Sequence, residues 1–262
     1  MPHSAGRQSV AKGDRVGGAL GYCTQPNPMY FRELAISLSC EVDSLPGGKS
    51  ARDFAFSAHA VQEVFLSFMP RKFVLDGTAK TNLMLGPRGN HPQYWKALGV
   101  NEYFVEDFDF QAFFDSSTQG QDDILLKILE ESLLDIANRS NADPAPIQKA
   151  IAATRACGCE RRGILPRLSR MTRSRKLKLN VVRHIFHGGE AWDLEIVNRK
   201  DEVLLKRSLL GRKPWAWMRA EYDFRRSILK GDNFVVLGLR GIQTYRLNVK
   251  KLEERLLRSL ER

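Results

Sequence analysis

The sequence predicts an α+β protein in two parts: an N-terminal part of mixed strands and helices, and a C-terminal antiparallel meander with packed helices. Apolar residues recur at helical spacing over 51–69 and 121–139. From residue 177 onward, short alternating runs are bounded by turns, which favours an antiparallel meander. Charge divides the chain as well: residues 1–150 hold 14 Lys or Arg against 18 Asp or Glu, and residues 151–262 hold 27 against 12.

Composition excludes several classes of protein. Hydrophobic residues make up 43% and charged residues 27% of the 262 residues, which is typical of a globular chain and not of a disordered one. No run approaches the roughly 18 apolar residues of a membrane span. Residues 1–28 contain no apolar segment of the secretory kind, so we expect a disordered lead-in, with Met29 as a candidate start, and a cytoplasmic protein with free cysteines.

The first part, residues 29–158, is expected to be an acidic α+β domain. Alternation over 31–42 predicts a half-buried strand, and Ser50 with Asp53 resembles a capping box that opens a helix over 51–69. Asp76-Gly77 predicts a hairpin turn between strands at 73–75 and 81–85. The expected elements that follow are a loop at 86–100, an aromatic strand over 103–114, a helix over 121–139, and a shorter helix from Pro144 to near Gly158.

The second part begins after a basic connector at 159–176 and is expected to be a basic α+β domain over 177–262. Strands are predicted at 177–186, 192–197 and 203–210, followed by a helix opened by Pro214 and closed by Gly231. That helix would carry an apolar stripe of Trp215, Met218, Tyr222 and Leu229. Strands at 234–239 and 244–249 lead to a final helix with Leu252, Leu256 and Leu260.

One stretch has half of a phosphate-binding motif. Gly47-Gly48-Lys49-Ser50 lies between a predicted strand and a predicted helix, where a phosphate-binding loop belongs. The first position of the full motif needs glycine, and here it is Asp43, whose carboxylate would repel phosphate. A tight turn with an N-cap serine is therefore the favoured interpretation, and a nucleotide-dependent enzyme stays an alternative.

Two further clusters could hold a metal ion. Cys157, Cys159, His184 and His187 offer the ligand types of zinc, but residues three apart on a strand point to opposite faces, and Cys-Gly-Cys is tighter than the usual spacing. Asp193, Glu195 and Lys200 could belong to a metal-dependent nuclease. Their alternation with apolar residues is also what a one-sided antiparallel strand shows. We expect no metal, no cofactor and no catalytic set.

The basic stretch is the strongest candidate for a binding site. Arginine dominates it and suits bidentate contacts to phosphate or carboxylate. Nearby aromatic residues add cation–π contacts and base stacking. The candidate residues for binding a partner or nucleic acid are Arg161, Arg162, Arg167, Arg170, Arg173, Arg175, Lys176, Lys178, Arg212, Lys213, Trp215 and Arg219. A competing interpretation is that this half docks on residues 101–150 of the same chain, which hold 11 acidic and 3 basic residues.

The segment from Glu102 to Phe110, rich in aromatic and acidic residues and followed by a long acidic helix, resembles bacterial immunity proteins. These are cytoplasmic antagonists of delivered toxins, and the resemblance covers residues 100–140. It implies an α+β binder that covers a toxin with a charged or aromatic face. Such families share no common motif, so the resemblance assigns no residue roles. The basic C-terminal half departs from the common pattern of an acidic inhibitor on a basic nuclease and implies an acidic toxin face.

Three functions remain on the sequence alone. The leading hypothesis is a non-enzymatic binding protein for an acidic macromolecule, in the manner of an immunity-type inhibitor. The first alternative is nucleic-acid binding through residues 161–178, with an affinity that falls steeply with salt. The second alternative is a metal-dependent nuclease or nucleotide-dependent enzyme.

Overall fold

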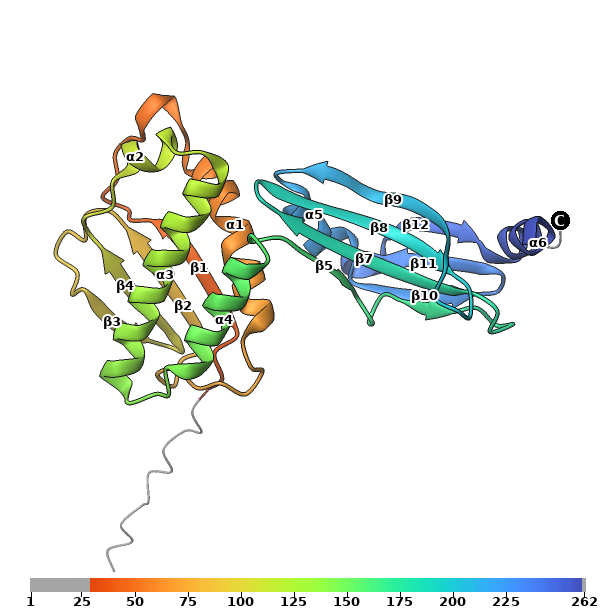
Figure 1. Cartoon of the computed structure of the whole chain (residues 1–262), viewed down its shortest axis with the longest axis horizontal. Helices are drawn as coiled ribbons and strands as arrows, with labels where there is room; N and C mark the ends of the chain where they lie inside the picture. Colours follow the sequence, from red (N-terminus) through yellow and green to blue (C-terminus); the bar gives the residue numbers. More distant parts are fainter. Residues whose placement is uncertain (1–28, 261–262) are drawn as a thin grey trace, which may run out of the picture.

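The computed structural model describes residues 29–260, so the expected lead-in at 1–28 lies outside the described residues. Two separate hydrophobic cores divide these residues into a first unit, 29–158, and a second unit, 161–260. The units lie side by side in an elongated arrangement (Figure 1). The predicted α+β class is confirmed. Within residues 29–260, no helix combines the length and apolar character needed to cross a membrane.

The first unit is built on a four-stranded sheet in the order β1-β2-β4-β3. Strands β1 (Glu33–Leu38), β2 (Lys80–Leu85) and β4 (Val100–Val105) are parallel, and β3 (Tyr94–Ala97) pairs antiparallel with β4 at one edge. Along β2, buried and half-exposed residues alternate. That alternation shows that the sheet packs on its core with one face only.

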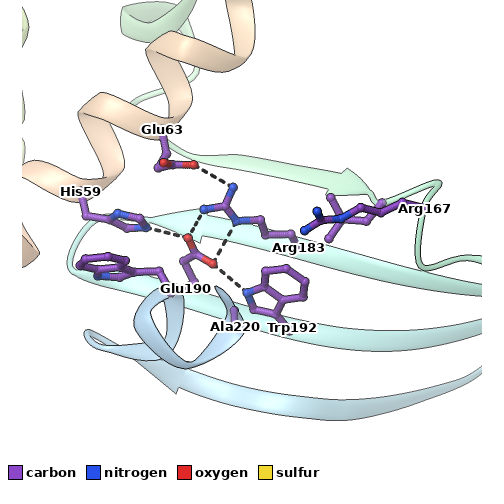
Figure 2. A pocket seen from close by; sticks show the side chains of 9 residues that line it. His59, Glu63, Arg167, Arg183, Glu190, Trp192 and Ala220 are labelled. Carbon is purple, nitrogen blue, oxygen red and sulfur yellow. Dashed lines mark hydrogen bonds and ion pairs between the residues drawn. The ribbon is translucent and has the colours of Figure 1, made fainter. Parts of the chain in front are cut away.

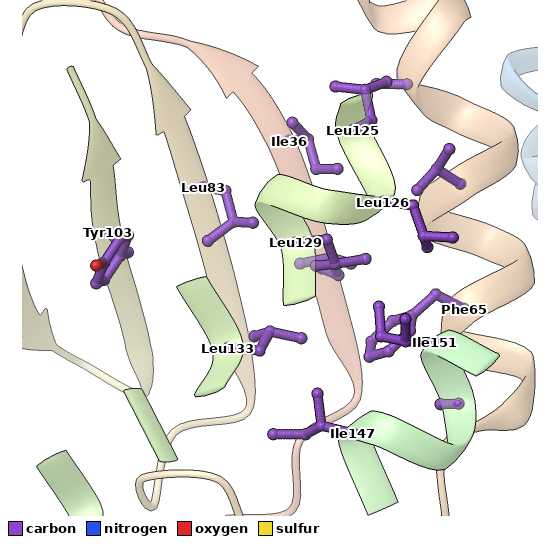
Figure 3. Close-up of a cluster of buried hydrophobic side chains, with 14 of the residues drawn as sticks. Ile36, Phe65, Leu83, Tyr103, Leu125, Leu126, Leu129, Leu133, Ile147 and Ile151 are labelled. Carbon is purple, nitrogen blue, oxygen red and sulfur yellow. The ribbon is translucent and has the colours of Figure 1, made fainter. Parts of the chain in front are cut away.

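Helices cover the buried face of this sheet. The main three are α1 (Ala51–Phe68), α3 (Thr118–Ser140) and α4 (Ala145–Ala156), with short α2 (Phe110–Asp115) and the 3₁₀ turn η1 (Pro46–Gly48) at one end. Leucines of α3 point between the strands and α1, as Figure 3 shows for Leu125, Leu129 and Leu133. Each fully buried leucine contributes about 1.5–3 kcal/mol of transfer free energy. Because these leucines of α3 pack against both the strands and α1, they hold α1 in place on the sheet.

The second unit is a sandwich of two antiparallel sheets. One sheet has the order β5-β7-β8-β9, with β6 also paired to β7, and the other has the order β10-β11-β12. Their facing side chains, among them Leu194 and Phe234, form the second core. Helices α5 (Ala216–Asp223) and α6 (Val249–Leu260) lie at opposite ends of the sandwich (Figure 1). The strands are β5 (Arg161–Ile164), β6 (Arg170–Met171), β7 (Lys178–Phe186), β8 (Gly189–Val197), β9 (Val203–Lys213), β10 (Arg226–Lys230), β11 (Asn233–Leu237) and β12 (Gln243–Asn248), and a 3₁₀ turn η2 spans Leu239–Gly241.

Several sequence predictions are confirmed. Ser50 and Asp53 form the expected capping box at the start of α1. The long helix predicted over 121–139 is α3, and the shorter helix after Pro144 is α4. The antiparallel meander predicted from residue 177 onward is β7-β8-β9. The helices could be identified because their core-facing residues recur at helical spacing.

Three predictions in the first unit are wrong. Asp76-Gly77 makes no hairpin, because β2 pairs in parallel with β1 and the Asp76 carboxylate accepts hydrogen bonds from Thr78. The loop expected at 86–100 contains β3. The aromatic strand ends at Val105, and Asp109 then caps α2.

Two predictions around the second unit also differ from the structure. The basic stretch does not form an exposed connector, because β5 and β6 both pair with β7 and belong to the sheet. The helix after Pro214 ends at Asp223, and residues 226–230 form β10, which pairs with β11. Long-range strand pairing outweighed local sequence in both places.

Candidate functional site

One face of α1 contacts the second unit. His59, Glu63 and Ser67 are spaced four residues apart and therefore lie on the same side of the helix. His59 contacts Glu190, Glu63 pairs with Arg183 at 2.8 Å, and the Arg161 guanidinium donates to Ser67 Oγ at 2.6 Å. Between these polar contacts, Ala60 and Val64 of α1 pack against Ile185 of β7 in a small apolar cluster.

A buried carboxylate is at the centre of this junction (Figure 2). Glu190 of β8 is fully buried and accepts hydrogen bonds from three side chains. His59 Nε2 lies 2.6 Å from Oε1, and Trp192 Nε1 donates to Oε2 at 2.7 Å. Arg183 donates through Nε to Oε2 at 3.0 Å and through Nη2 to Oε1. Four donors therefore satisfy the carboxylate, which is what a buried charge requires.

The protonation states follow from these contacts. Burial raises the pKa of the Glu190 carboxyl, but hydrogen bonds from His59 and Arg183 and the positive charge of Arg183 outweigh it and bring the pKa to about 2. Burial lowers the pKa of Arg183, whereas the hydrogen bond to Glu190 and the charge of Glu63 raise it, and the net direction is upward. Glu190 is therefore an anion held by a permanent cation.

A cavity of about 170 Å³ opens beside this network, lined by residues of both units. The donors and acceptors of Glu190, Arg183 and Glu63 are already engaged with one another. Arg167 also lines the cavity, and among the described residues it has no acidic partner. Because its central charges are mutually satisfied, the network serves to join the two units.

The candidate zinc ligands do not converge. His187 Nδ1 lies 3.0 Å from Asp122 Oδ1 on α3, whereas His184 Nε2 lies 2.5 Å from Glu160. Burial raises the pKa of Cys159 to about 12, with a further contribution from the charge of Asp122, so the thiol is protonated. Across residues 29–260, no group of three or more His, Cys, Asp or Glu side chains is arranged to hold a metal ion.

The carboxylates considered for a nuclease are paired with cations. Asp193 binds Lys206 at 2.9 Å and Glu195 binds Arg162. In the candidate phosphate-binding loop at 47–50, Lys49 lies 5.9 Å from the ring centroid of Phe114. The Asp53 carboxylate accepts a hydrogen bond from the backbone N–H of Ser50 at the start of α1. A phosphate at that helix terminus would meet the Asp53 carboxylate, so this geometry does not favour the phosphate-loop interpretation.

The candidate binding residues fall into two groups at opposite ends of the second unit. Many are engaged near the junction: Arg161 lies 4.4 Å from the ring centroid of Phe68 and Arg212 lies 3.8 Å from that of Phe186. Arg219 on α5 pairs with Asp223 at 3.1 Å. Toward the other end of the sandwich, Arg170 donates to two backbone carbonyls and Lys178 lies 3.9 Å from Asp201 in the β8–β9 turn. The structure thus does not bring the twelve residues together as one site.

A second group forms what we call the distal basic end: Arg173, Arg175, Lys176, Arg199 and Lys200. The first three lie in the β6–β7 turn and the last two in the β8–β9 turn. Arg199 Nε donates to the carbonyl of Arg175 at 3.1 Å, which joins the two turns. All five side chains are exposed, and none has an acidic partner within residues 29–260. Arg199 and Lys200 were not among the binding residues expected from sequence.

Helix α5 has apolar side chains on two opposite faces. Trp217, Ala220 and Phe224 face inward: Trp217 stacks on His59, Ala220 is buried, and Phe224 stacks on Trp192 at 5.0 Å. Trp215, Met218 and Tyr222 follow the same spacing two residues earlier and face outward, with exposed fractions of 38%, 41% and 58%. The sequence predicted this second stripe as the helix's apolar face, and it is the exposed one.

The η2 turn extends this exposed apolar surface. Thr244 Oγ1 donates to the carbonyl of Asp223 at 2.7 Å, which holds the turn against the end of α5. Leu239 and Ile242 on the turn are exposed at 43% and 65%. We call Trp215, Met218, Tyr222, Leu239 and Ile242 the α5 patch. Lys213 contacts the Trp215 ring, and Arg219, Arg225 and Arg240 are close to patch residues in sequence.

Comparison with protein-family models, curated proteins and solved structures finds no match to this chain.

Proposed function

We propose that this protein is a binding protein whose second unit engages an acidic macromolecule, in the manner of an immunity-type inhibitor that covers the face of a cognate protein. The observation that supports it is the separation of charge between the units. Among the described residues, the Glu63–Arg183 pair is the one ion pair of an arginine or lysine that crosses between them. The net basic charge of the second unit is therefore not neutralised by the first unit and is available to a partner.

The acidic stretch at 101–150 does not neutralise the basic unit. Among residues 29–260, its ion pair with the second unit is Asp122 with His187, whereas Glu130 pairs with Arg155 and Asp135 with Arg139 inside the first unit. This arrangement argues against internal docking as the purpose of the charge division. The electrostatic field of a basic surface increases the rate at which an acidic partner associates with it.

Affinity capture from cells that carry the gene tests the proposal. The full chain should retain an acidic partner at 50 mM salt and release much of it at 200 mM salt, because exposed charges are screened. A control variant, Arg52→Glu with Arg71→Glu and Lys72→Glu, reverses three exposed charges of the first unit and should retain the partner. A full chain that captures no acidic macromolecule at low salt would refute the proposal.

The distal basic end favours nucleic acid as a second candidate partner. The distal basic end consists of five exposed cations on two joined turns and includes no aromatic side chain. Such a set is better suited to contacts with phosphates than to an apolar protein interface. If all five bind phosphates of a duplex, affinity should fall roughly 500-fold between 50 and 200 mM salt. Replacing Arg173, Arg175 and Lys176 by Ala removes about three of the five phosphate contacts. The slope of log affinity against log salt should fall in the same proportion. Equal affinity and salt slope in the wild type and this variant would exclude the distal end.

A further inference from the structure

The α5 patch is an uncovered helix face whose composition differs from that of an ordinary surface. Apolar stripes on two opposite faces of a helix are normally both buried, because each needs a partner to cover it. On α5 the inner stripe is covered by the junction and the second core, whereas the outer stripe is exposed. Five of the large exposed apolar side chains of the protein gather here, on one helix and the turn held against it.

The chemistry of the patch points to one class of partner. Tryptophan, tyrosine, methionine and arginine are the residue types enriched at the centres of protein–protein interfaces, and the first two with arginine provide most binding hot spots. Nucleic acid would use the aromatic rings and the cations, but it offers little to Met218, Leu239 and Ile242. An apolar centre with a basic rim is complementary to a protein face with an apolar centre and an acidic rim.

The rim supplies that complementarity. Lys213 lies 5.8 Å from the ring centroid of Trp215, and Arg219 is held by Asp223. Arg225 and Arg240 are exposed and have no acidic partner among residues 29–260. Arg225 is positioned by its backbone, which donates to the carbonyl of Leu237 at 2.9 Å. Arg225 and Arg240 therefore lie next to the apolar centre with charges that no described acidic side chain pairs.

We propose that the α5 patch is the docking surface for an acidic protein partner, with Trp215, Met218 and Tyr222 inserted into an apolar depression of that partner and Arg225 and Arg240 paired with carboxylates at its margin. This inference rests on the proposed binding function and adds to it the surface used and the class of macromolecule bound.

Photo-crosslinking tests the surface directly. The full chain is produced in cells that carry the gene, with a benzophenone amino acid in place of Tyr222, or in place of Tyr30 as an exposed control on the first unit. Light should produce an adduct with an acidic protein from position 222 and none from position 30. An adduct of position 222 with nucleic acid or with a second copy of this chain would overturn the inference, as would capture of a partner by the wild type without any adduct at 222.

The crosslinked protein is then purified, and its affinity for the variants is measured. Trp215→Ala and Tyr222→Ala should each weaken binding at least 10-fold, as hot-spot residues do. Arg240→Glu should slow association in a manner that high salt removes. The variant with Arg173, Arg175 and Lys176 replaced by Ala should bind within about 3-fold of wild type, since those side chains lie outside the patch.

The failures can be told apart. A partner whose affinity depends on the distal basic end and not on Trp215 or Tyr222 would leave the proposed function standing and refute the α5 patch. A wild-type chain that yields no adduct and captures no acidic macromolecule would refute both. Thermal unfolding of each variant serves as the control for folding, because all the substituted side chains are exposed.

Discussion

The imidazole of His59 stacks on the indole of Trp217, with ring centroids 4.9 Å apart and planes 14° from parallel. His59 belongs to α1 of the first unit and Trp217 to α5 of the second. Since Trp217 lies on the inner face of α5, this contact fixes the helix that carries the α5 patch on its other face. The junction and the candidate docking surface therefore share one short helix.

Replacing Trp217 with Ala should destabilise the protein much more than replacing Trp215 with Ala. The first change removes the stack on His59 and leaves a void at the junction, at a cost of about 2–4 kcal/mol. The second removes an exposed ring and should stay within about 0.5 kcal/mol. Urea unfolding of both variants measures the difference, and equal losses would contradict the assignment of the two faces.

Glu190→Gln should be strongly destabilising. The amide presents a donor where the carboxylate accepts and leaves the Arg183 cation without its buried counter-charge, at a cost of about 3–5 kcal/mol. Glu63→Gln is the matched control, because it alters the half-exposed partner of the same arginine and should cost at most about 1 kcal/mol. Denaturant unfolding at neutral pH separates the two, and a larger loss for Glu63→Gln would show that Glu190 is not the centre of the network.

Acid should lower the free energy of unfolding over a defined range of pH. The pKa of Glu190 is about 2 in the folded protein, against 4.5 for an unperturbed glutamate, so the folded state holds the proton less tightly than the unfolded state. The contribution of the Glu190 carboxylate to the free energy of unfolding is on the order of 3 kcal/mol. It is fully present above about pH 4.5 and is lost as the pH falls toward 2. Unfolding free energies measured from pH 6 to pH 2 should show this loss, and Glu190→Gln should show a smaller one.

Gly238→Ala should disturb the α5 patch. A Cβ atom there would lie 2.5 Å from the carbonyl oxygen of Tyr222 and 3.1 Å from the Cα of Asp223, so the η2 turn would have to move away from α5. The expected cost is about 1–3 kcal/mol. Gly211→Ala on β9 is the control, because its Cβ meets open space. Thermal unfolding of both variants, followed by binding of the crosslinked partner, would show whether the turn positions the patch.

Local patterns predicted the elements that bury one face. Helix α1 could be found from its apolar spacing and from the Ser50–Asp53 capping box, both of which lie within a few residues. The Asp76-Gly77 hairpin was wrong because the same dipeptide also suits a side-chain cap, and only the distant pairing of β2 with β1 decides between them. Residues 226–230 likewise became a strand because β11 was available to pair with them.

The candidate site was harder to predict for the same reason. His59 and Glu190 are 131 residues apart, and no spacing rule connects them. On α5, the stripe of Trp215, Met218 and Tyr222 and the stripe of Trp217, Ala220 and Phe224 are equally apolar, so sequence could not say which is buried. The arginine-rich stretch was identified as basic, but its strand pairing separates Arg161 and Arg162 from Arg173 and Arg175.

The link between the units is short: α4 ends at Ala156 and β5 begins at Arg161. A tether of this length keeps its two ends at an effective concentration in the millimolar range. An interface as small as one stripe of α1 and the Asp122–His187 contact can then remain closed, although the same contacts would be too weak between separate molecules. Cleavage within 157–160 should therefore allow the two units to dissociate on dilution. A protease that reaches this link would release the basic second unit from the acidic first unit.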